Sequence, residues 1–262
     1  MSTTVLTLIE QAIHMRIILL NVRHGGGQRA QKLLDWLTSP SPDLVVLPEW
    51  RDNESGGVIK EGFEARGYYV ATACASVMRS NGVLVAAKQA FRSRRITPRD
   101  ADKGELMLAD FASGWRLLAA YFPQGKAKIP FFASCLDETK RSDGTPFLLL
   151  GDLNTGCNGF DVEGSGVPFV CSNQFDALQA HGGLVDLWRT EHGEKREWSW
   201  RSPRNGFRVD HALANAAFRN RFPAMLCMYD HAPRETGLTD HSALILVESK
   251  PRLAGFDICA AD

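Results

Sequence analysis

Short apolar runs alternate with amphipathic segments along most of the chain. Runs rich in β-branched and aromatic residues, bounded by turn-forming residues, predict strands. The run Gly82–Ala87 is almost wholly apolar, which predicts an interior strand buried on both faces. The predicted strands are Arg16–Val22, Leu44–Pro48, Tyr69–Ala73, Gly82–Ala87, Met107–Ala112, Trp115–Tyr121, Phe147–Gly151, Phe207–Ala214, Ala224–Tyr229 and Ser242–Val247.

Helical periodicity is confined to fewer segments. In the first of them Leu33, Leu34 and Leu37 recur at helical spacing. The predicted helices are Gln28–Leu37, Val58–Arg66, Ile129–Lys140 and Ser172–His181. Helices interleaved at the ends of the chain, with consecutive strands in the middle, predict an α+β domain of layered mixed sheets rather than a uniform parallel sheet.

The ends of the chain differ from its middle. We expect a disordered or helical leader at residues 1–14, one domain at 15–250 and a C-terminal tail at 251–262. The leader lacks a basic region and Glu10 interrupts its apolar patch, which disfavours an export signal. No apolar run reaches the roughly 18 residues of a membrane span.

The composition limits the expected cellular location and binding partners of the chain. The six cysteines form no C-x-x-C motif, so a reducing, cytoplasmic location is expected, and the chain is expected to be a monomer. The 30 basic and 30 acidic side chains cancel, which excludes a protein held to nucleic acid by bulk positive charge. Any contact with a polyanion must therefore be made by a limited part of the protein surface.

The segment Gly25–Ala30 formally matches the glycine-rich fingerprint of dinucleotide-binding proteins. However, Asn21, Arg23 and His24 separate it from the strand core, whereas the fingerprint needs its turn to begin where the strand ends. No second strand–helix–strand half follows later in the chain. A flexible connector is therefore favoured over an NAD-binding oxidoreductase.

Polar side chains recur at strand ends. Asp152 and Asn154 follow the apolar strand Phe147–Gly151, and on extended backbone side chains two apart share a face. An Asx turn that closes the strand explains this pair equally well. The same kind of residue stands at or near the ends of other predicted strands, however, namely Asn21, Glu49, Asp210, Asp240 and His241. The recurrence favours one shared site.

These residues lie in motifs that resemble the endonuclease/exonuclease/phosphatase superfamily, and within it the exonuclease III-like abasic-site endonucleases. The motifs occur in the order of the family from Met15 to about Leu246. They are MRIILLNV at 15–22, DLVVLPEW at 43–50, AAYFPQG at 119–125, LLLGDLNTG at 148–156, WSW and GFRVDHALAN within 198–215, and GLTDHSALIL at 237–246.

The resemblance implies a four-layer α/β/β/α sandwich of two packed mixed sheets and cleavage of phosphoester bonds with Mg²⁺ or Mn²⁺. By position, Glu49 resembles the metal carboxylate, with Asn21 beside it. Asp152 resembles the residue that orients or deprotonates the attacking water, and Asn154 its positioning partner.

The resemblance also implies roles on the phosphate side. Asp210 resembles the acid that orients His241, whose imidazolium would stabilise the pentacovalent phosphorane. Tyr121 resembles the tyrosine that supports the developing negative charge or the leaving group. Adjacent residues on extended backbone face opposite ways. Asp240 and His241 therefore both reach the site only if their segment is a loop, and Asp240 is treated as a second-metal or supporting residue.

Elementary chemistry agrees with these roles, because hydrolysis of a phosphodiester needs an in-line hydroxide equivalent and neutralised phosphate oxygens. A dinuclear metallophosphoesterase is the competing metal enzyme, but its D-x-H, G-D-x-x-D and G-N-H-[DE] elements are absent from the sequence. For His24, His181 and His192, an exposed or loop position is the favoured interpretation.

The segment Lys195–Arg208 mixes cations with aromatic residues, a pattern that suits stacking on bases while phosphates are held. Phe207 and Arg204 are expected at the rim of the substrate site, and Trp198 and Trp200 in the core. His231 and Arg234 are candidates for further phosphate contacts, although a solvated loop is the favoured interpretation there.

The sequence departs from the abasic-site endonucleases in three places. Glu49 follows proline rather than glutamine, Asp210 is followed by His211, and the connection from Tyr121 to Gly151 is short. The expected function is therefore a metal-dependent phosphodiesterase that acts on nucleic acid, with DNA favoured. A phosphatase or phosphodiesterase for a small or lipid phosphoester is the alternative, and a non-catalytic binding module is a minor one.

Overall fold

The computed structural model describes residues 13–75, 80–142, 144–164 and 166–249. The expected leader, apart from its last two residues, and the expected C-terminal tail lie outside these ranges. The first strand, β1, begins at Ile13 and pairs with the last strand, β14, as far as Ser249. The strand therefore starts ahead of the expected position, Arg16.

The first sheet has the order β13-β14-β1-β2-β4-β3. Its only parallel pair is β1 with β2, which a helical crossover connects. The bounds are β1 Ile13–Leu19, β2 Leu44–Trp50, β3 Tyr69–Ala73, β4 Gly82–Ala87, β13 Met225–Asp230 and β14 Ala243–Ser249. Every residue of β4 is buried, as its apolar run predicts.

The second sheet has the order β5-β6-β7-β8-β12-β9. Here the parallel pair is β7 with β8, again joined through a helix. The bounds are β5 Phe91–Arg95, β6 Glu105–Phe111, β7 Trp115–Tyr121, β8 Phe147–Asp152, β9 Val185–Asp186 and β12 Asp210–Ala214.

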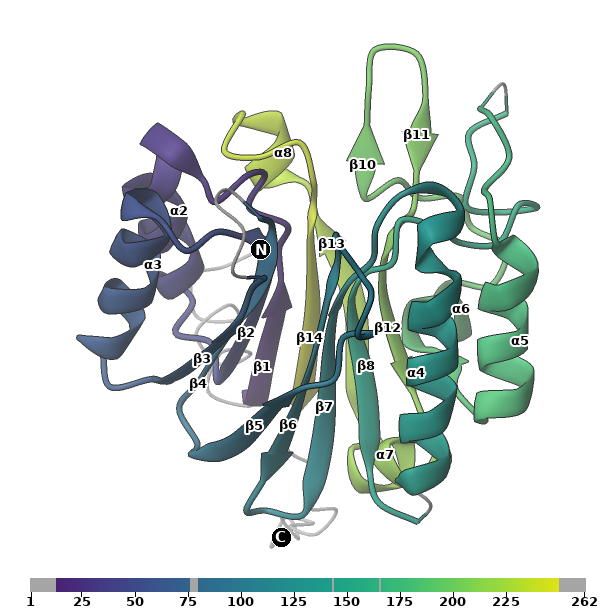
Figure 1. The fold of residues 1–262 in the computed structure, drawn as a ribbon, viewed down its shortest axis with the longest axis horizontal. Coiled ribbons are helices and arrows are strands. Elements are labelled where there is room, and N and C mark those ends of the chain that lie inside the picture. The colour runs from purple at the N-terminus through teal and green to yellow at the C-terminus, as the bar shows by residue number, and fades with distance from the viewer. Residues whose placement is uncertain (1–12, 76–79, 143, 165, 250–262) are drawn as a thin grey trace, which may run out of the picture.

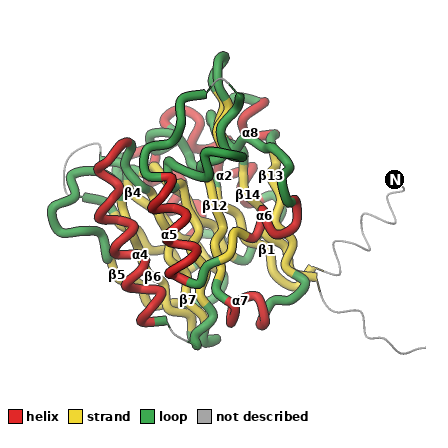
Figure 2. The backbone as a smooth tube through the Cα atoms, turned by 90° about the vertical axis from the view of Figure 1, so that its right-hand side faces the viewer, coloured by secondary structure: helices red, strands yellow, loops and turns green. Residues whose placement is uncertain are grey.

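Helices cover the outer faces of the two sheets. In Figure 1, α2 and α3 flank the first sheet and α4 and α5 flank the second, and Figure 2 shows α4 and α5 in front of the strands. A central core lies between the sheets, and a further core lies under each helical layer. The bounds are α2 Ala30–Thr38, α3 Glu54–Glu64, α4 Ile129–Arg141 and α5 Ser172–Gly182. The predicted α/β/β/α sandwich is therefore confirmed.

One predicted strand was wrong. Phe207–Ala214 is divided between β11 (Gly206–Phe207) and β12, because Arg208 turns into buried ion pairs between them. β11 pairs with β10 (Trp200–Arg201) in a hairpin that stands apart from both sheets (Figure 1).

Several short or exposed elements were not predicted from the sequence. β5 has the sequence FRSRR and is mostly exposed at a sheet edge, so it carries no apolar pattern. The short helices are α6 Leu187–His192, α7 Ala216–Arg221 and α8 Ala232–Glu235, with 3₁₀ turns η1 at Gly27–Arg29 and η2 at Gly125–Lys128.

The glycine-rich segment after β1 is a connector. Gly25, Gly26 and Gly27 all have positive φ, a conformation that glycine adopts without steric cost. They lead into η1, so α2 does not begin at the glycines. This geometry lacks the direct strand-to-helix turn of a dinucleotide fingerprint.

Candidate active site

The polar strand ends converge at one edge of the two sheets. Asp152 ends β8, and its register partners are Tyr121 on the parallel strand β7 and Asp210 on the antiparallel strand β12. Because β12 runs against β8, its first residue lies beside the last residue of β8. Tertiary pairing therefore brings together residues that are far apart in sequence.

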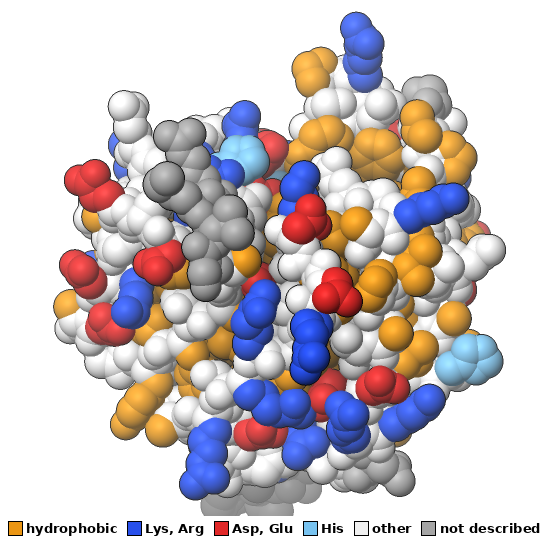
Figure 3. Space-filling view, viewed as in Figure 1, with side chains coloured by type: hydrophobic (Ala, Val, Ile, Leu, Met, Phe, Trp, Pro, Cys, Tyr) orange, Lys and Arg blue, Asp and Glu red, His pale blue; other side chains and the backbone are white. Residues whose placement is uncertain are grey.

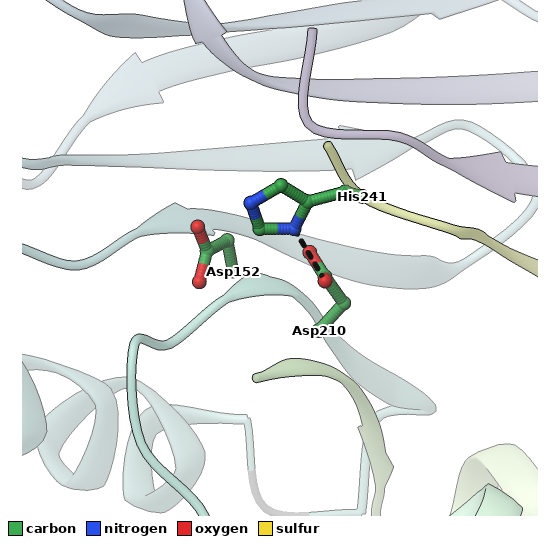
Figure 4. A group of neighbouring side chains, drawn as sticks. All are labelled: Asp152, Asp210 and His241. Carbon is green, nitrogen blue, oxygen red and sulfur yellow. Dashed lines mark hydrogen bonds and ion pairs between the residues drawn. The ribbon is translucent and has the colours of Figure 1, made fainter. Parts of the chain in front are cut away.

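His241 lies between two carboxylates. Its Nδ1 is 2.8 Å from Oδ2 of Asp210, and Figure 4 shows the carboxylate of Asp152 on the other side of the ring. One ligand-type atom from each of these residues lies within 4.8 Å of the others. The bond to Asp210 engages Nδ1, so Nε2 is the ring nitrogen left to face a substrate.

Asn21 connects the first sheet to the second. Its Nδ2 donates to Oδ2 of Asp152 at 2.9 Å and lies 3.2 Å from Oε1 of Glu49. Its Oδ1 accepts the backbone N–H of Arg23 at 2.9 Å. The amide thus holds a carboxylate from each sheet side by side.

The packing of these charges shifts their pKa values. Burial, and then the nearby Asp210 carboxylate, raises the pKa of Asp152 to about 7. Burial alone would lower the pKa of His241, but the charge and hydrogen bond of Asp210 raise it to about 10. Burial, followed by the charge of Glu49, raises the pKa of Tyr121 above its usual value. At neutral pH the site therefore combines an imidazolium with a carboxylate that can accept a proton.

Two of the candidate site residues, Glu49 and Asn154, have an unusual backbone conformation that orients their side chains. Glu49 has φ 59° at an irregularity in the pairing of β2, and Asn154 has φ 49°. For a non-glycine residue, this left-handed conformation costs of order 1–3 kcal/mol, which surrounding contacts must offset. For Glu49 those contacts are the backbone N–H groups of His24 and Gly25, at 2.9 and 2.8 Å.

A cavity of about 450 Å³ opens over these groups. Its polar side includes Glu49, Asp152, Asn154, Asp240 and His241. Its apolar side includes Val167, Phe169, Val170, Trp200 and Phe207. On the face shown in Figure 3, hydrophobic side chains gather beneath the β10–β11 hairpin. The cavity therefore joins a cluster of charged side chains to an aromatic wall.

Asp240 and His241 both line the cavity because their segment precedes β14 and is irregular, as the sequence argument required. Oδ2 of Asp240 accepts the indole N–H of Trp200 at 3.2 Å and lies 3.8 Å from Nε of Arg23. The prediction that Trp198 and Trp200 are core residues was wrong, because both are only half-buried. Trp200 is part of the cavity wall instead.

The four residues predicted to contact the substrate do not all line the cavity. Phe207 lines the cavity, and Arg204 is exposed in the turn of the β10–β11 hairpin, away from the lining. His231 and Arg234 are also outside the lining. Nδ1 of His231 bonds to Oγ of Ser242 at 2.8 Å, and Arg234 donates to the carbonyl of Trp198 at 2.8 Å.

Among the cations of the segment Lys195–Arg208, only Arg208 is buried, and the others are exposed. Arg208 is buried and binds Asp161 and Asp186 at 2.7 and 2.6 Å. Further ion pairs join Arg201 to Glu163 and Lys195 to Glu197. Arg208 therefore stabilises the fold and does not hold a phosphate.

Sequence reasoning missed three polar residues around the site. His24 places Nδ1 3.1 Å from Oε2 of Glu49, Asn81 donates to the hydroxyl of Tyr121 at 3.2 Å, and Lys128 lines the cavity. His24 follows Asn21 closely in sequence, which is a usable signal. Asn81 and Lys128 stand in segments without any recognisable motif.

The donor set fits a hard divalent cation. Carboxylate and amide oxygens are the ligands that Mg²⁺ and Mn²⁺ prefer, and Glu49, Asp152 and Asp240 line one cavity. Oδ1 of the neighbouring Asp210 is buried without a hydrogen-bond partner. Such a concentration of negative charge is stabilised by a bound cation.

The sequence profile of the Endonuclease/Exonuclease/phosphatase family matches residues 18–241. The chain belongs to this family. Its members hydrolyse phosphoester bonds and depend on divalent metal ions, so the chain is a hydrolase of this class. No curated protein sequence matches it. Among the described residues, no helix is both long enough and apolar enough to cross a bilayer.

Solved structures of similar fold cover nearly the whole chain. An AP endonuclease from Archaeoglobus fulgidus is 21% identical, with a TM-score of 0.73, over 89% of this chain and 99% of that one. A 3′-5′ exonuclease from Neisseria meningitidis is 20% identical, with a TM-score of 0.75, over 90% and 100%. An AP endonuclease from Leishmania major is 16% identical, with a TM-score of 0.69, over 96% and 100%. At these identities the likeness establishes the fold.

Proposed function

We propose that this family member is a metal-dependent phosphodiesterase that cleaves nucleic acid, with DNA as its substrate. One observation carries the proposal: the His241–Asp210 pair faces Asp152 while Asn21 joins Asp152 to Glu49. A general base, a protonated imidazole and an oxygen-rich cation site therefore surround one position at the floor of the cavity. This arrangement meets the requirements of in-line phosphoester hydrolysis.

Each side chain has a definable task. Asp152 accepts the proton of the attacking water, and Asn154 orients that water from the adjoining turn. His241, kept protonated by Asp210, donates from Nε2 to a non-bridging phosphate oxygen. Tyr121 donates its hydroxyl proton toward the developing charge, since its oxygen already accepts from Asn81. Preorganised donors of this kind act where charge develops.

Glu49 and Asp240 would hold Mg²⁺ or Mn²⁺, and Asn21 would either supply an oxygen or hold Glu49 in place. When bound, the cation neutralises phosphate charge and favours ionisation of water. Held near Asp152, the same positive charge would also favour the ionised carboxylate.

The nucleic-acid assignment rests on the aromatic wall. Trp200, Phe207 and Phe169 lie with ring centroids 5.8 and 5.4 Å apart along one side of the cavity. Aromatic rings beside a phosphate site suit an unstacked base or sugar. The similar solved structures named above are AP endonucleases and an exonuclease, and a 3′ phosphatase from Neisseria was solved with a product DNA hairpin. A monomeric, cytoplasmic enzyme remains the expectation.

A second candidate is a phosphatase or phosphodiesterase for a small or lipid phosphoester. Arg208, Arg201 and Lys195 form ion pairs with acidic residues of the chain itself, and the net charge is zero. Both observations favour this candidate, because long nucleic acids are usually held by free surface cations.

The test is a substrate panel with Mg²⁺ and with Mn²⁺. It compares an abasic duplex, plain single- and double-stranded DNA, RNA and soluble phosphoesters. We expect cleavage of DNA that chelation and Asp152→Asn both abolish while the fold is retained. Turnover of soluble phosphoesters alone would favour the second candidate, and undiminished cleavage by Asp152→Asn would reject the mechanism. Cation binding without any turnover would indicate a binding module.

A further inference from the structure

Lys128 is a buried cation beside the reaction centre. Its side chain lines the cavity, yet the residue is only 2% exposed. Its ammonium donates to the backbone carbonyl of Asn154, a neutral acceptor. Among the described residues no carboxylate forms an ion pair with it. An ammonium has three donors, and buried lysines are ordinarily paired with an acid.

Its position in the fold makes the charge more costly. Lys128 is the residue immediately before α4, at the positive end of the helix dipole, where a cation is disfavoured. Burial lowers the pKa of Lys128 to about 8, while the Asp152 carboxylate opposes that shift. Burial and the helix dipole both destabilise the charged lysine in the folded chain, which favours a ligand as the reason for its presence.

The ligand has to be an anion that reaches the cavity floor. Lys128 shares the cavity with Asp152, Asn154 and His241, the groups proposed to act on a phosphoester. The ammonium offers positive charge to the cavity on the side of Asn154, where its hydrogen bond to the carbonyl anchors it. A phosphoryl group carries negatively charged oxygens that match such a site.

We propose that Lys128 forms an oxyanion site that binds a phosphoryl group within the cavity. This inference rests on the proposed function, since the same cavity holds the hydrolytic groups. The phosphoryl group is either that of the substrate or inorganic phosphate. Lys128 would then be a substrate-binding residue that no strand-end motif indicates.

The opposing explanation is structural, with Lys128 only fastening the turn at Asn154. Lys128→Met separates the two explanations because methionine retains an unbranched apolar stem and removes the charge. If Lys128 serves a ligand, the variant melts at the same or a higher temperature, because an unpaired buried cation has been removed. If Lys128 serves the fold, the variant melts at a lower temperature.

The experiment measures thermal unfolding of the full chain in a chelator, with increasing inorganic phosphate. We expect phosphate to raise the melting temperature of the wild type, as any ligand of the native state does. Lys128→Met should weaken the apparent phosphate affinity by about tenfold or more, in line with loss of a charge-assisted hydrogen bond. Lys128→Arg should retain part of the response.

Lys126→Met is the matched control, because Lys126 is exposed two residues earlier in η2. Its phosphate response should equal that of the wild type. The proposal is overturned if phosphate stabilises the Lys128→Met and Lys126→Met variants equally, or if it does not stabilise the wild type. Asp152→Asn should lose hydrolysis while the phosphate response persists, so failure of the proposed function and failure of this site are separable.

Discussion

His241 Nδ1 lies 2.8 Å from Oδ2 of Asp210, and the two residues stand at the starts of strands of different sheets, His241 two residues before β14. Asp210 begins β12 of the second sheet, and His241 immediately precedes the segment that leads into β14 of the first. Asn21 makes a similar connection from β1 toward Asp152 at the end of β8. The candidate site is therefore assembled at the junction of the two sheets and depends on how they pack.

Replacing Asp210 by asparagine should disable His241. Without the carboxylate, the main influence that raises the imidazole pKa is lost, so the fall in kcat/KM at high pH should move down from about pH 10. The rate should fall by roughly 10²–10⁴-fold, the usual contribution of a positioned proton donor. A pH–rate profile measures both effects. Asp176→Asn, at an exposed position on α5, is the control and should leave the profile unchanged.

The stability of the fold should depend on pH through His241. Its folded-state pKa of about 10 lies above the ordinary value of 6.5, so protonation favours the folded state. This stabilisation is fully present below pH 6.5 and is lost as the pH rises toward 10. The difference in free energy of unfolding between wild type and His241→Gln should therefore shrink over that interval. Urea denaturation in a chelator provides the measurement, and a constant difference would contradict the prediction.

Asn21→Ala should weaken cation binding rather than unfold the chain. The Asn21 amide donates hydrogen bonds to the carboxylates of Glu49 and Asp152 and so fixes their positions. Removal of such supporting contacts typically costs 10–100-fold in metal affinity or activity. Titration of activity with Mg²⁺ or Mn²⁺ should show a higher half-saturating concentration. Asn173→Ala is the control, because Asn173 is exposed on α5 and lies outside the cavity lining. An equal half-saturating cation concentration in both variants would show that Asn21 does not support cation binding.

Arg208→Met should destabilise the fold strongly. Loss of the guanidinium leaves the buried Asp186 without an arginine partner and the buried Asp161 with Arg189 alone, an effect of about 3–5 kcal/mol. The control Arg204→Met, in the exposed hairpin turn, should change stability by no more than about 0.5 kcal/mol. Chemical denaturation compares the two. If Arg208→Met unfolded like wild type but bound DNA less tightly, Arg208 would have the phosphate role that its burial argues against.

The sequence predicted the sandwich well, because its apolar runs are strong and lie in the order of a known family. Strand-end polarity also singled out Glu49, Asp152 and Asp210 as candidate site residues, and the fold brings them together at one edge of the sheets. The pattern failed where local signals are weak. The edge strand β5 is charged and exposed, and Arg208 looks like a surface cation until its partners in distant segments are known.

Lys128 and Trp200 show the same limit at the site. An isolated lysine before a helix resembles a solvated residue, and a tryptophan in a short strand resembles a core residue. Lys128 is buried because α4 packs on the outer face of the second sheet, and Trp200 bonds to Asp240 from the β10–β11 hairpin, which stands apart from both sheets.

By itself, the sequence determined which backbone segments form strands and helices and which polar groups stand at their ends, because periodicity and turn chemistry are local properties. Tertiary structure alone decided which of those groups meet. Register placed Asp210 beside Asp152, and sheet packing placed His241 against Asp210. Burial then set their pKa values, since desolvation and the nearness of other charges exist only once the chain has folded.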